Sequence, residues 1–580
     1  MTFSMIVVKI IGFADKILIS NLYSYFGDSY AAFGTALYNN AYEVYVLFFS
    51  IATAGFPIAI SRMISESIAQ KRYNDVKRIH KVAVPFFAIM GTICFLFMVA
   101  SSFIYIQIIK SPYSLYAMLM LSPSILFGCL ISAYRGYFEG QRNMMPTAIS
   151  EVVEAGSKLI FGLGIAFLIM KLGGDSYFNT GTVFGLTFSG KNARMDALNT
   201  IMSFSVAGAI GGILLGSVLA FLFLYLRYKK IGDGIPKEYY QNSIPARTKK
   251  ETFIRMVKTA LPIGLTALVM NVGIFIDSTI IQNVLHSLSV TNGKEIVAQY
   301  KHFGVDLSDQ LARNPEKSTL HTALWGCYGA ATPLMQLVTA VTQAFGTSAM
   351  PNVASAWTKG DKGELKTSIE TVLRLTMLFT LPAGLGLVAL AYPIMDIVYS
   401  SEVLAVIGAE VLKIMGFTAI VIAIGTPLSS MLQGIGRVDL PLKIYTVGIG
   451  IKVATTWLFV RVPSINIQGA SMGSLVAYSF ILLVSMYLLV KHSGVMPNFM
   501  SVLVKPLISA AACALTAFFA HMLFNSFLPG LAATGIAVLL AGIVYITFLL
   551  LLKTFTRNEL KFLPKGEKIV TLLEKYHLIG

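Results

Sequence analysis

Stretches of about 20 apolar residues recur along this 580-residue chain between short polar breaks, and they constrain its fold more than any other feature. A helix of about 20 apolar residues crosses the ~30 Å hydrocarbon core of a bilayer. We therefore expect fourteen spans, near residues 3–25, 39–61, 82–106, 114–134, 147–170, 202–226, 259–284, 322–348, 369–392, 403–427, 441–460, 467–490, 503–524 and 530–552.

Composition supports this interpretation, because 56% of the residues are hydrophobic and only 13% are charged. Soluble chains average about 25% charged residues, so a row of soluble domains is excluded. All four cysteines lie inside apolar runs, where they favour core packing over a disulfide framework or a zinc site. We expect an all-α polytopic membrane protein whose first apolar stretch is a span and not a signal peptide.

The distribution of Lys and Arg predicts the orientation in the membrane. One alternate set of loops, with the C-terminal tail, carries 31 of the 45 cations, the other set carries nine, and five lie inside spans. By the positive-inside rule the richer set faces the cytoplasm, and the even span count puts both termini there. The net charge of +17 is then mainly loop charge, and no basic cluster with interleaved aromatics indicates nucleic-acid binding.

Weak internal repeats divide the predicted spans into two sets of six. Gly140 precedes Lys158 by 18 residues, as Gly434 precedes Lys452, and two further matches link the first and second spans to the seventh and eighth. Because six is even, both halves insert with the same orientation, related by a pseudo-twofold axis along the membrane normal. We expect an N-lobe at 1–230, a C-lobe at 250–490, two additional helices at 500–553 and a cytoplasmic tail at 554–580.

Charged residues inside the first span are the strongest functional signal, because an ionisable group at mid-membrane costs at least ~2.5 kcal/mol and often marks a pathway. Lys9 and Lys16 are seven residues apart and share a helix face, with Asp15 beside them. Two cations on one face favour an anionic group. In the alternative interpretation Asp15 neutralises one lysine and Lys9 extends to the interface.

Other charged positions support cavity or structural roles. Glu43 and Asp277 are isolated acids that could line a cavity, balance the lysines, or bind a proton or Na⁺ for coupling. Arg62 is expected to pair with Glu66 at i,i+4 and to meet substrate at the cytoplasmic mouth. We expect interhelical pairing for two further sets, namely Glu151, Glu154 and Lys158, and Glu410 and Lys413. The apolar residues of 62–81 suggest an amphipathic helix on the inner leaflet or an ordinary connecting helix.

Enzyme motifs are lacking. The run Gly185–Lys191 matches part of a phosphate-binding loop, but Asn192 replaces the Ser or Thr that would hold Mg²⁺, and the run lies in a predicted outer loop. The sequence contains no His-Glu-x-x-His. We expect no enzymatic activity, no catalytic residues, no metal site and no cofactor.

Two strings resemble the lipid II flippase and polysaccharide-biosynthesis branch of the MOP (MATE-like) flippase superfamily. The first is Ser50–Glu66, with Gly55-Phe56-Pro57 at its centre, and the second is Arg135–Gly140 followed by Met145–Glu154. The resemblance covers nearly the whole chain. Lys9 and Lys16 match two arginines of the family pattern around Ile10-Ile11-Gly12-Phe13, where lysine keeps the charge but loses the bidentate fork.

This resemblance implies export of an undecaprenyl-diphosphate-linked saccharide, either lipid II or a polysaccharide repeat unit, from the inner to the outer leaflet by alternating access. It implies a bacterial-type plasma membrane and a role in cell-wall or polysaccharide biosynthesis. Lys9, Lys16, Asp15 and Arg62 are the expected substrate-binding residues, with Glu43 and Asp277 as cavity or coupling residues. We expect a functional monomer coupled to Na⁺, H⁺ or the membrane potential.

Two alternatives belong to other functional classes. A MATE-like cation-coupled multidrug antiporter would share the fold, but it should present acids without lysines in its first-lobe cavity. A membrane-embedded transferase would need clustered catalytic acids or histidines near the membrane surface, and the seven histidines do not cluster.

Overall fold

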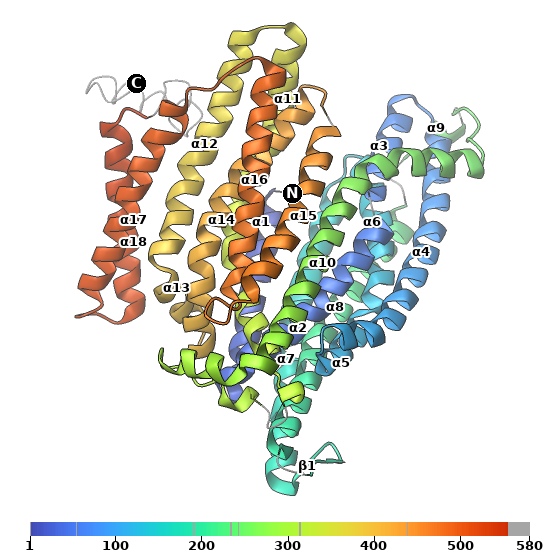
Figure 1. Cartoon of the computed structure of the whole chain (residues 1–580). Helices are drawn as coiled ribbons and strands as arrows, with labels where there is room; N and C mark the ends of the chain where they lie inside the picture. The colour runs from blue at the N-terminus through green and yellow to red at the C-terminus, as the bar shows by residue number, and fades with distance from the viewer. Residues whose placement is uncertain are drawn as a thin grey trace. The chain divides into compact units, whose positions relative to one another are not determined.

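The computed structural model describes residues 2–554, apart from 54, 190–191, 233–234, 242, 312–314 and 438. Nearly all of the described chain is α-helical, as Figure 1 shows. Twelve helical segments within the described residues are long and apolar enough to cross a membrane. Helices suit such spans because their backbone groups hydrogen-bond within the segment. The chain is a multi-pass helical membrane protein.

The predicted first and eighth spans form helices but are not among these twelve. The first is α1 (Thr2–Leu22), and the eighth lies in α11 (Leu320–Lys359). α1 carries Lys9, Asp15 and Lys16 within one span length, which lowers its hydropathy. The count of fourteen and the repeat stay predictions.

The chain divides into two compact units, which we describe separately. The N-terminal unit comprises residues up to Val297 together with Asp306–Gly326, and the C-terminal unit comprises Ala298–Val305 together with the chain from Cys327 onward. The predicted lobes, 1–230 and 250–490, derive from the repeat and stay a prediction, as does the separation of 500–553. The predicted tail lies outside the described residues except for its first residue, Thr554.

The N-terminal unit is a bundle of helices. It contains α1, α2 (Asp28–Thr53), α3 (Phe56–Ala69), α4 (Tyr73–Ile108), α5 (Leu115–Leu121), α6 (Pro123–Gly140), α7 (Met145–Thr180), α8 (Ala193–Ile231), α9 (Lys237–Gln241) and most of α10 (Lys249–Lys301). The backbones of α7 and α8 approach so closely that a Cβ added to Gly212 would clash with the backbone nitrogen of Gly162. Small residues at such crossings let two backbones meet in a membrane.

The predicted second span breaks where its sequence carries Gly and Pro. Gly55 has a left-handed φ of 75° and precedes α3, which has Pro57 in its first turn. The stretch 62–81 is the end of α3 followed by the start of α4, with the connection at residues 70–72. A single amphipathic helix over 62–81 is therefore wrong. Of its apolar residues, Met63, Ile64, Val76 and Ile79 are buried in protein and Ile68 is partly buried.

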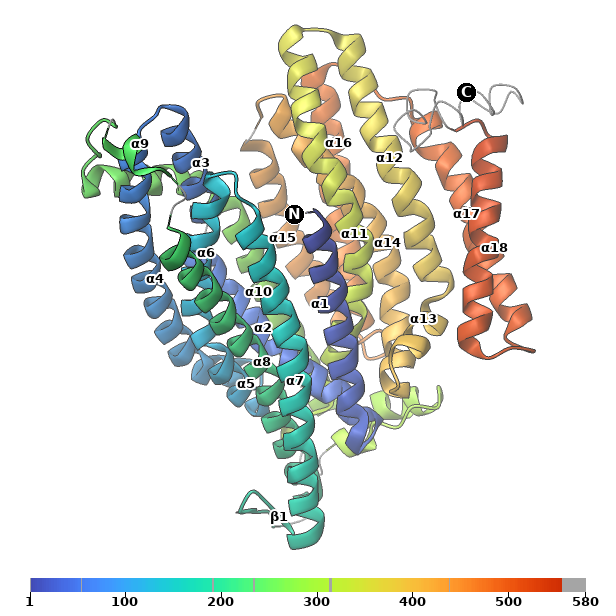
Figure 2. The same cartoon turned by 180° about the vertical axis from the view of Figure 1, so that it is seen from behind.

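One small sheet departs from the all-α expectation. β1 (Thr182–Val183) pairs with β2 (Leu186–Thr187) in antiparallel register, in the connection between α7 and α8. This hairpin lies beyond the end of α7 in Figure 1 and Figure 2. Between the predicted seventh and eighth spans, α10 continues to Lys301, and the chain then forms the short 3-10 turns η3 (Ser308–Gln310) and η4 (Pro315–Lys317).

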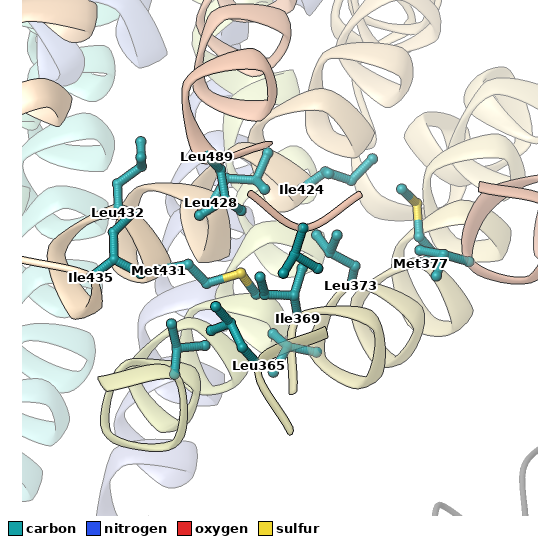
Figure 3. Close-up of a cluster of buried hydrophobic side chains, with 14 of the residues drawn as sticks. Leu365, Ile369, Leu373, Met377, Ile424, Leu428, Met431, Leu432, Ile435 and Leu489 are labelled. Carbon is teal, nitrogen blue, oxygen red and sulfur yellow. The ribbon is translucent and has the colours of Figure 1, made fainter. Parts of the chain in front are cut away.

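The C-terminal unit packs its helices around a large apolar core. It contains α11 from Cys327, α12 (Lys362–Ala389), α13 (Ala391–Val398), α14 (Glu402–Gly434), α15 (Asp439–Val460), α16 (Gln468–Ser493), α17 (Lys505–Phe524) and α18 (Gly530–Leu551). Figure 3 shows the core, where Leu365 and Ile369 of α12 face Leu428 and Met431 of α14. Asp361 caps α12 by accepting hydrogen bonds from the backbone nitrogens of residues 363 and 364.

The last two helices, α17 and α18, are anchored to α12. The Tyr545 hydroxyl donates to the Leu378 carbonyl at 2.7 Å. The Asn498 backbone nitrogen donates to Glu370 Oε1 at 2.8 Å, just before the π-helical turn η5 (Met500–Val504) that leads into α17. The C-terminal pair therefore belongs to the C-terminal unit.

Candidate functional site

A buried ion pair joins the first span to α7. Lys158 Nζ lies 2.8 Å from Asp15 Oδ2, where the Asp15 side chain is wholly buried and that of Lys158 is 20% exposed. α1 and α7 pack side by side, as Figure 2 shows. Removing two charges from water is expensive, and a close opposite charge compensates for it. Asp15 is thus the counter-ion of a lysine that the sequence analysis had given a structural role.

Lys16 belongs to the same cluster. Its side chain is partly exposed, and the charged groups that act on its ammonium are Lys158, Asp15 and Glu43. The cluster therefore holds two cations and two carboxylates, whose formal charges cancel. The lysine side chains supply six N–H donors, which suits oxygen-rich anions.

Lys9 is exposed, whereas Glu43 is partly buried near Lys16. The Lys9 side chain is exposed, two turns from Lys16 toward the N-terminus of α1. Glu43 of α2 is partly buried, and its carboxylate acts on Lys16 and on Tyr105 of α4. The cation that joins Lys16 in this cluster is therefore Lys158, whereas the sequence analysis paired Lys16 with Lys9.

Aromatic rings of α2 border the cluster. Lys158 Nζ lies 5.7 Å from the centroid of the buried Tyr38 ring, within the range of a cation–π attraction. Tyr38 is the first of four aromatic residues along this face of α2, followed by Tyr42, Tyr45 and Phe49. A spacing of four, three and four residues is the signal that could have identified this face from the sequence.

Asp277 lies in α10 and is almost fully buried within the N-terminal unit. Its helix packs near α4 through stacked rings of Phe275 and Tyr105, whose centroids are 5.0 Å apart. Tyr105 is also the ring on which Glu43 acts. The two predicted coupling acids thus lie on helices that both border Tyr105.

Arg62 forms its predicted pair and a larger network. Its Nε lies 2.8 Å from Glu66 Oε1, and Arg255 Nη2 lies 2.7 Å from Glu66 Oε2. Arg255, at the start of α10, was missed because it is 189 residues from Glu66. The Arg62 side chain is 67% exposed, so it is accessible to a ligand.

Interhelical pairing is confirmed for Glu154 and Lys158 of α7 and is wrong for α14. Arg135 Nη2 of α6 lies 2.9 Å from Glu154 Oε2 of α7, and Arg135 Nε donates to Ser150 Oγ at 2.9 Å. Lys413 instead pairs with Glu410 of its own helix at 2.5 Å, with both side chains exposed. An i,i+3 pair on one helix surface needs no partner helix.

Sequence profiles of two families match the chain. The family described as "Polysaccharide biosynthesis protein" matches residues 30–303, and the family described as MatE matches residues 322–458. The lipid II flippase MurJ of Bacillus subtilis (strain 168) is 26% identical over 478 residues, which are 80% of this chain and 77% of that protein.

Two solved structures share the fold. The lipid II flippase MurJ in an inward closed conformation has a TM-score of 0.61 at 14% identity, covering 94% of this chain and 97% of that one. An inward-facing multidrug resistance MATE family transporter of the MOP superfamily has a TM-score of 0.60 at 15% identity, covering 84% and 94%. These relatives are flippases and transporters, and none of the three is described as an enzyme.

Proposed function

This chain belongs to the MOP flippase superfamily, and from that premise we propose that it moves an undecaprenyl-diphosphate-linked saccharide from the inner to the outer leaflet. The observation that carries the proposal is the cluster of Lys16 and Lys158 around the buried Asp15. The saccharide is the repeat unit of a cell-wall or capsule polymer, and lipid II is one such substrate.

Asp15 neutralises Lys158, and Glu43 offsets the charge of Lys16. A diphosphate carries several negative charges on clustered oxygens, and both ammonium groups can donate hydrogen bonds to it. Substrate binding then exchanges one counter-ion for another, since the diphosphate takes the place of Asp15 beside Lys158. The empty transporter keeps no uncompensated buried charge, which favours its return without cargo.

The exchange also suggests where coupling occurs. When the diphosphate binds Lys158, the Asp15 carboxylate loses its ion-pair partner and lies beside another anion. A proton or Na⁺ at Asp15, or at the acids Glu43 and Asp277, would restore neutrality. A membrane potential negative inside favours outward movement of the anion by about 2.3 kcal/mol per charge per 100 mV.

Topology fits this direction of transport. The loop charges predict cytoplasmic termini in a bacterial-type plasma membrane, with Arg62 near the cytoplasmic mouth and Lys9 between that mouth and Lys16. The headgroup would enter from the cytoplasm, pass these two cations and reach the cluster. We propose alternating access by a single chain.

Complementation tests the function directly. A bacterial strain depleted of its lipid II flippase, expressing this chain, should regain growth and outer-leaflet lipid II that is accessible to an external probe. If accessibility stays at the depleted level with lipid II, a strain lacking a capsule repeat-unit flippase provides the same test for the other substrate class. Failure in both strains, with the chain present in the membrane, would overturn the proposal.

A MATE-like multidrug antiporter is the second candidate, because the MatE profile matches residues 322–458 and a MATE transporter shares the fold. An organic cation would meet Lys16 and Lys158 beside the carboxylates of Asp15 and Glu43. Efflux of ethidium from cells that express the chain would support this function, whereas lipid flipping without efflux would exclude it.

A further inference from the structure

A column of stacked aromatic rings runs along α2 from the ion cluster. Ring centroids are 6.4 Å apart for Tyr38 and Tyr42, 5.9 Å for Tyr42 and Tyr45, and 5.5 Å for Tyr45 and Phe49. The first and last pairs are nearly parallel, with interplanar angles of 14° and 10°. Successive rings three or four residues apart meet on one helix face.

The rings of Tyr45 and Phe49 pack against Gly128 of α6. A Cβ on Gly128 would lie 2.7 Å from Phe49 Cε2 and 3.4 Å from the Tyr45 hydroxyl oxygen. Glycine at this position makes room for both rings, so the structure holds them in place. Two of the four rings are thus packed closely against α6.

Charged groups border two rings of the column, Tyr38 and Tyr45. Lys158 lies over the Tyr38 ring at one end, and the groups that act on Tyr45 include Glu154 and Arg135, which pair with each other at 2.9 Å. From Tyr38 to Tyr45 the helix rises about 10 Å. This is comparable to the length of a disaccharide, so a diphosphate at Lys158 would place two attached sugars alongside the column.

Exposure distinguishes the column from ordinary core packing. Tyr38 is buried, but the Tyr42 side chain is 39% exposed in the middle of a span. A lipid-facing position in a span favours a wholly apolar side chain, because a hydroxyl loses its hydration there. An exposed tyrosine between two charged pairs instead suits a ligand with an apolar face and polar edges.

We propose that Tyr42 and Tyr45 form the saccharide subsite of this transporter, holding pyranose rings whose C–H faces stack on the aromatic rings. This inference rests on the proposed function and specifies how that site recognises its cargo. The Arg135–Glu154 pair hydrogen-bonds the sugar hydroxyl and acetamido groups at the far end, since a guanidinium donates and a carboxylate accepts. The ion cluster recognises the diphosphate, and the column recognises what is attached to it.

The test compares two substrates in the same proteoliposomes. The purified full chain is reconstituted with undecaprenyl diphosphate, and with undecaprenyl diphosphate bearing an N-acetylglucosamine-containing disaccharide. The readout is the ratio of their flipping rates, which does not depend on how much active protein each preparation contains. Tyr42→Leu should lower the rate for the disaccharide substrate about 2- to 10-fold relative to the sugar-free lipid.

Three variants serve as controls. Tyr42→Phe keeps the ring and should keep the wild-type ratio, as should Phe97→Leu, which removes an exposed ring of α4. Lys158→Gln should lower both rates and leave the ratio unchanged. An unchanged ratio in both Tyr42→Leu and Tyr45→Leu would overturn the saccharide subsite while leaving the flippase function intact. A wild-type protein that flips neither lipid would overturn both.

Discussion

Lys158 of α7 and Asp15 of α1 form a 2.8 Å ion pair across the first-span interface, and the Asp15 side chain has no exposed surface. Such a pair contributes little net stability compared with apolar residues, but breaking it leaves a buried charge. The stability of the N-terminal unit therefore depends on keeping Lys158 and Asp15 paired.

Changing one partner should destabilise the protein more than changing both. Asp15→Asn leaves Lys158 without its counter-ion and should cost about 3 kcal/mol, seen as a lower Tm in detergent. The double variant D15N/K158Q removes both charges and should recover much of that loss. Equal Tm values for D15N and the double variant would show that Lys158 is not left as an uncompensated buried charge when Asp15 is removed.

A glycine contact gives a steric prediction. A Cβ on Gly326 would lie only 1.7 Å from the Ala32 carbonyl oxygen of α2. Gly326→Ala should therefore separate the start of α11 from α2 and cost about 3 kcal/mol or more. The matched control is Gly164→Ala, at an exposed position of α7 with no neighbour within 4 Å, where helix propensity predicts a gain of up to about 1 kcal/mol. Equal Tm values for the two variants would contradict this packing.

Hydrogen bonds attach the connection between α9 and α10 to the start of α4. Asp75 accepts hydrogen bonds from Arg72 Nε at 2.6 Å and from the Arg247 backbone nitrogen at 2.8 Å, and its side chain is 4% exposed. The Asn74 side-chain amide donates to the Tyr240 and Ser243 carbonyls at 3.3 and 3.2 Å. These bonds fix the segment that leads into α10.

Asp75→Asn should release this segment. The amide oxygen accepts hydrogen bonds more weakly than a carboxylate, and it carries no charge to form an ion pair with Arg72. Limited trypsin digestion should then cleave faster after Arg247, Lys249 and Lys250. Asp439→Asn, which breaks an exposed pair with Lys443, should leave that rate unchanged. An equal cleavage rate in the two variants would show that the segment does not depend on Asp75.

Local sequence patterns predicted the helices well and the contacts between helices poorly. A window of 20 apolar residues fixes a span because lipid offers the backbone no alternative partner, and the break at Gly55 follows from adjacent Gly and Pro. The sequence patterns assigned Lys158 to the repeat, through its spacing to Gly140, and to interhelical pairing with Glu151 and Glu154. Its pairing with Asp15 depends on which face α1 presents to α7, and hydropathy does not encode that choice.

The same limit applies to the other site residues. Lys9 and Lys16 share a face in any helix, so the sequence favoured them as a pair, but the depth of each depends on its neighbours. The aromatic column differs, because its spacing along α2 is a local pattern that is visible in the sequence. The fold adds what the local pattern does not contain, namely that Lys158 of α7 lies beside Tyr38 and that Arg135 of α6 acts on Tyr45.

The central claim is that Lys16 and Lys158 hold the diphosphate. The most direct measurement is flipping of sugar-free undecaprenyl diphosphate by the charge-neutral variant D15N/K158Q, by Lys16→Gln and by the control Lys413→Gln in proteoliposomes. We predict at least about a tenfold loss in the first two, equivalent to about 1.4 kcal/mol, and wild-type flipping in the control. Wild-type flipping by both D15N/K158Q and Lys16→Gln would contradict the account.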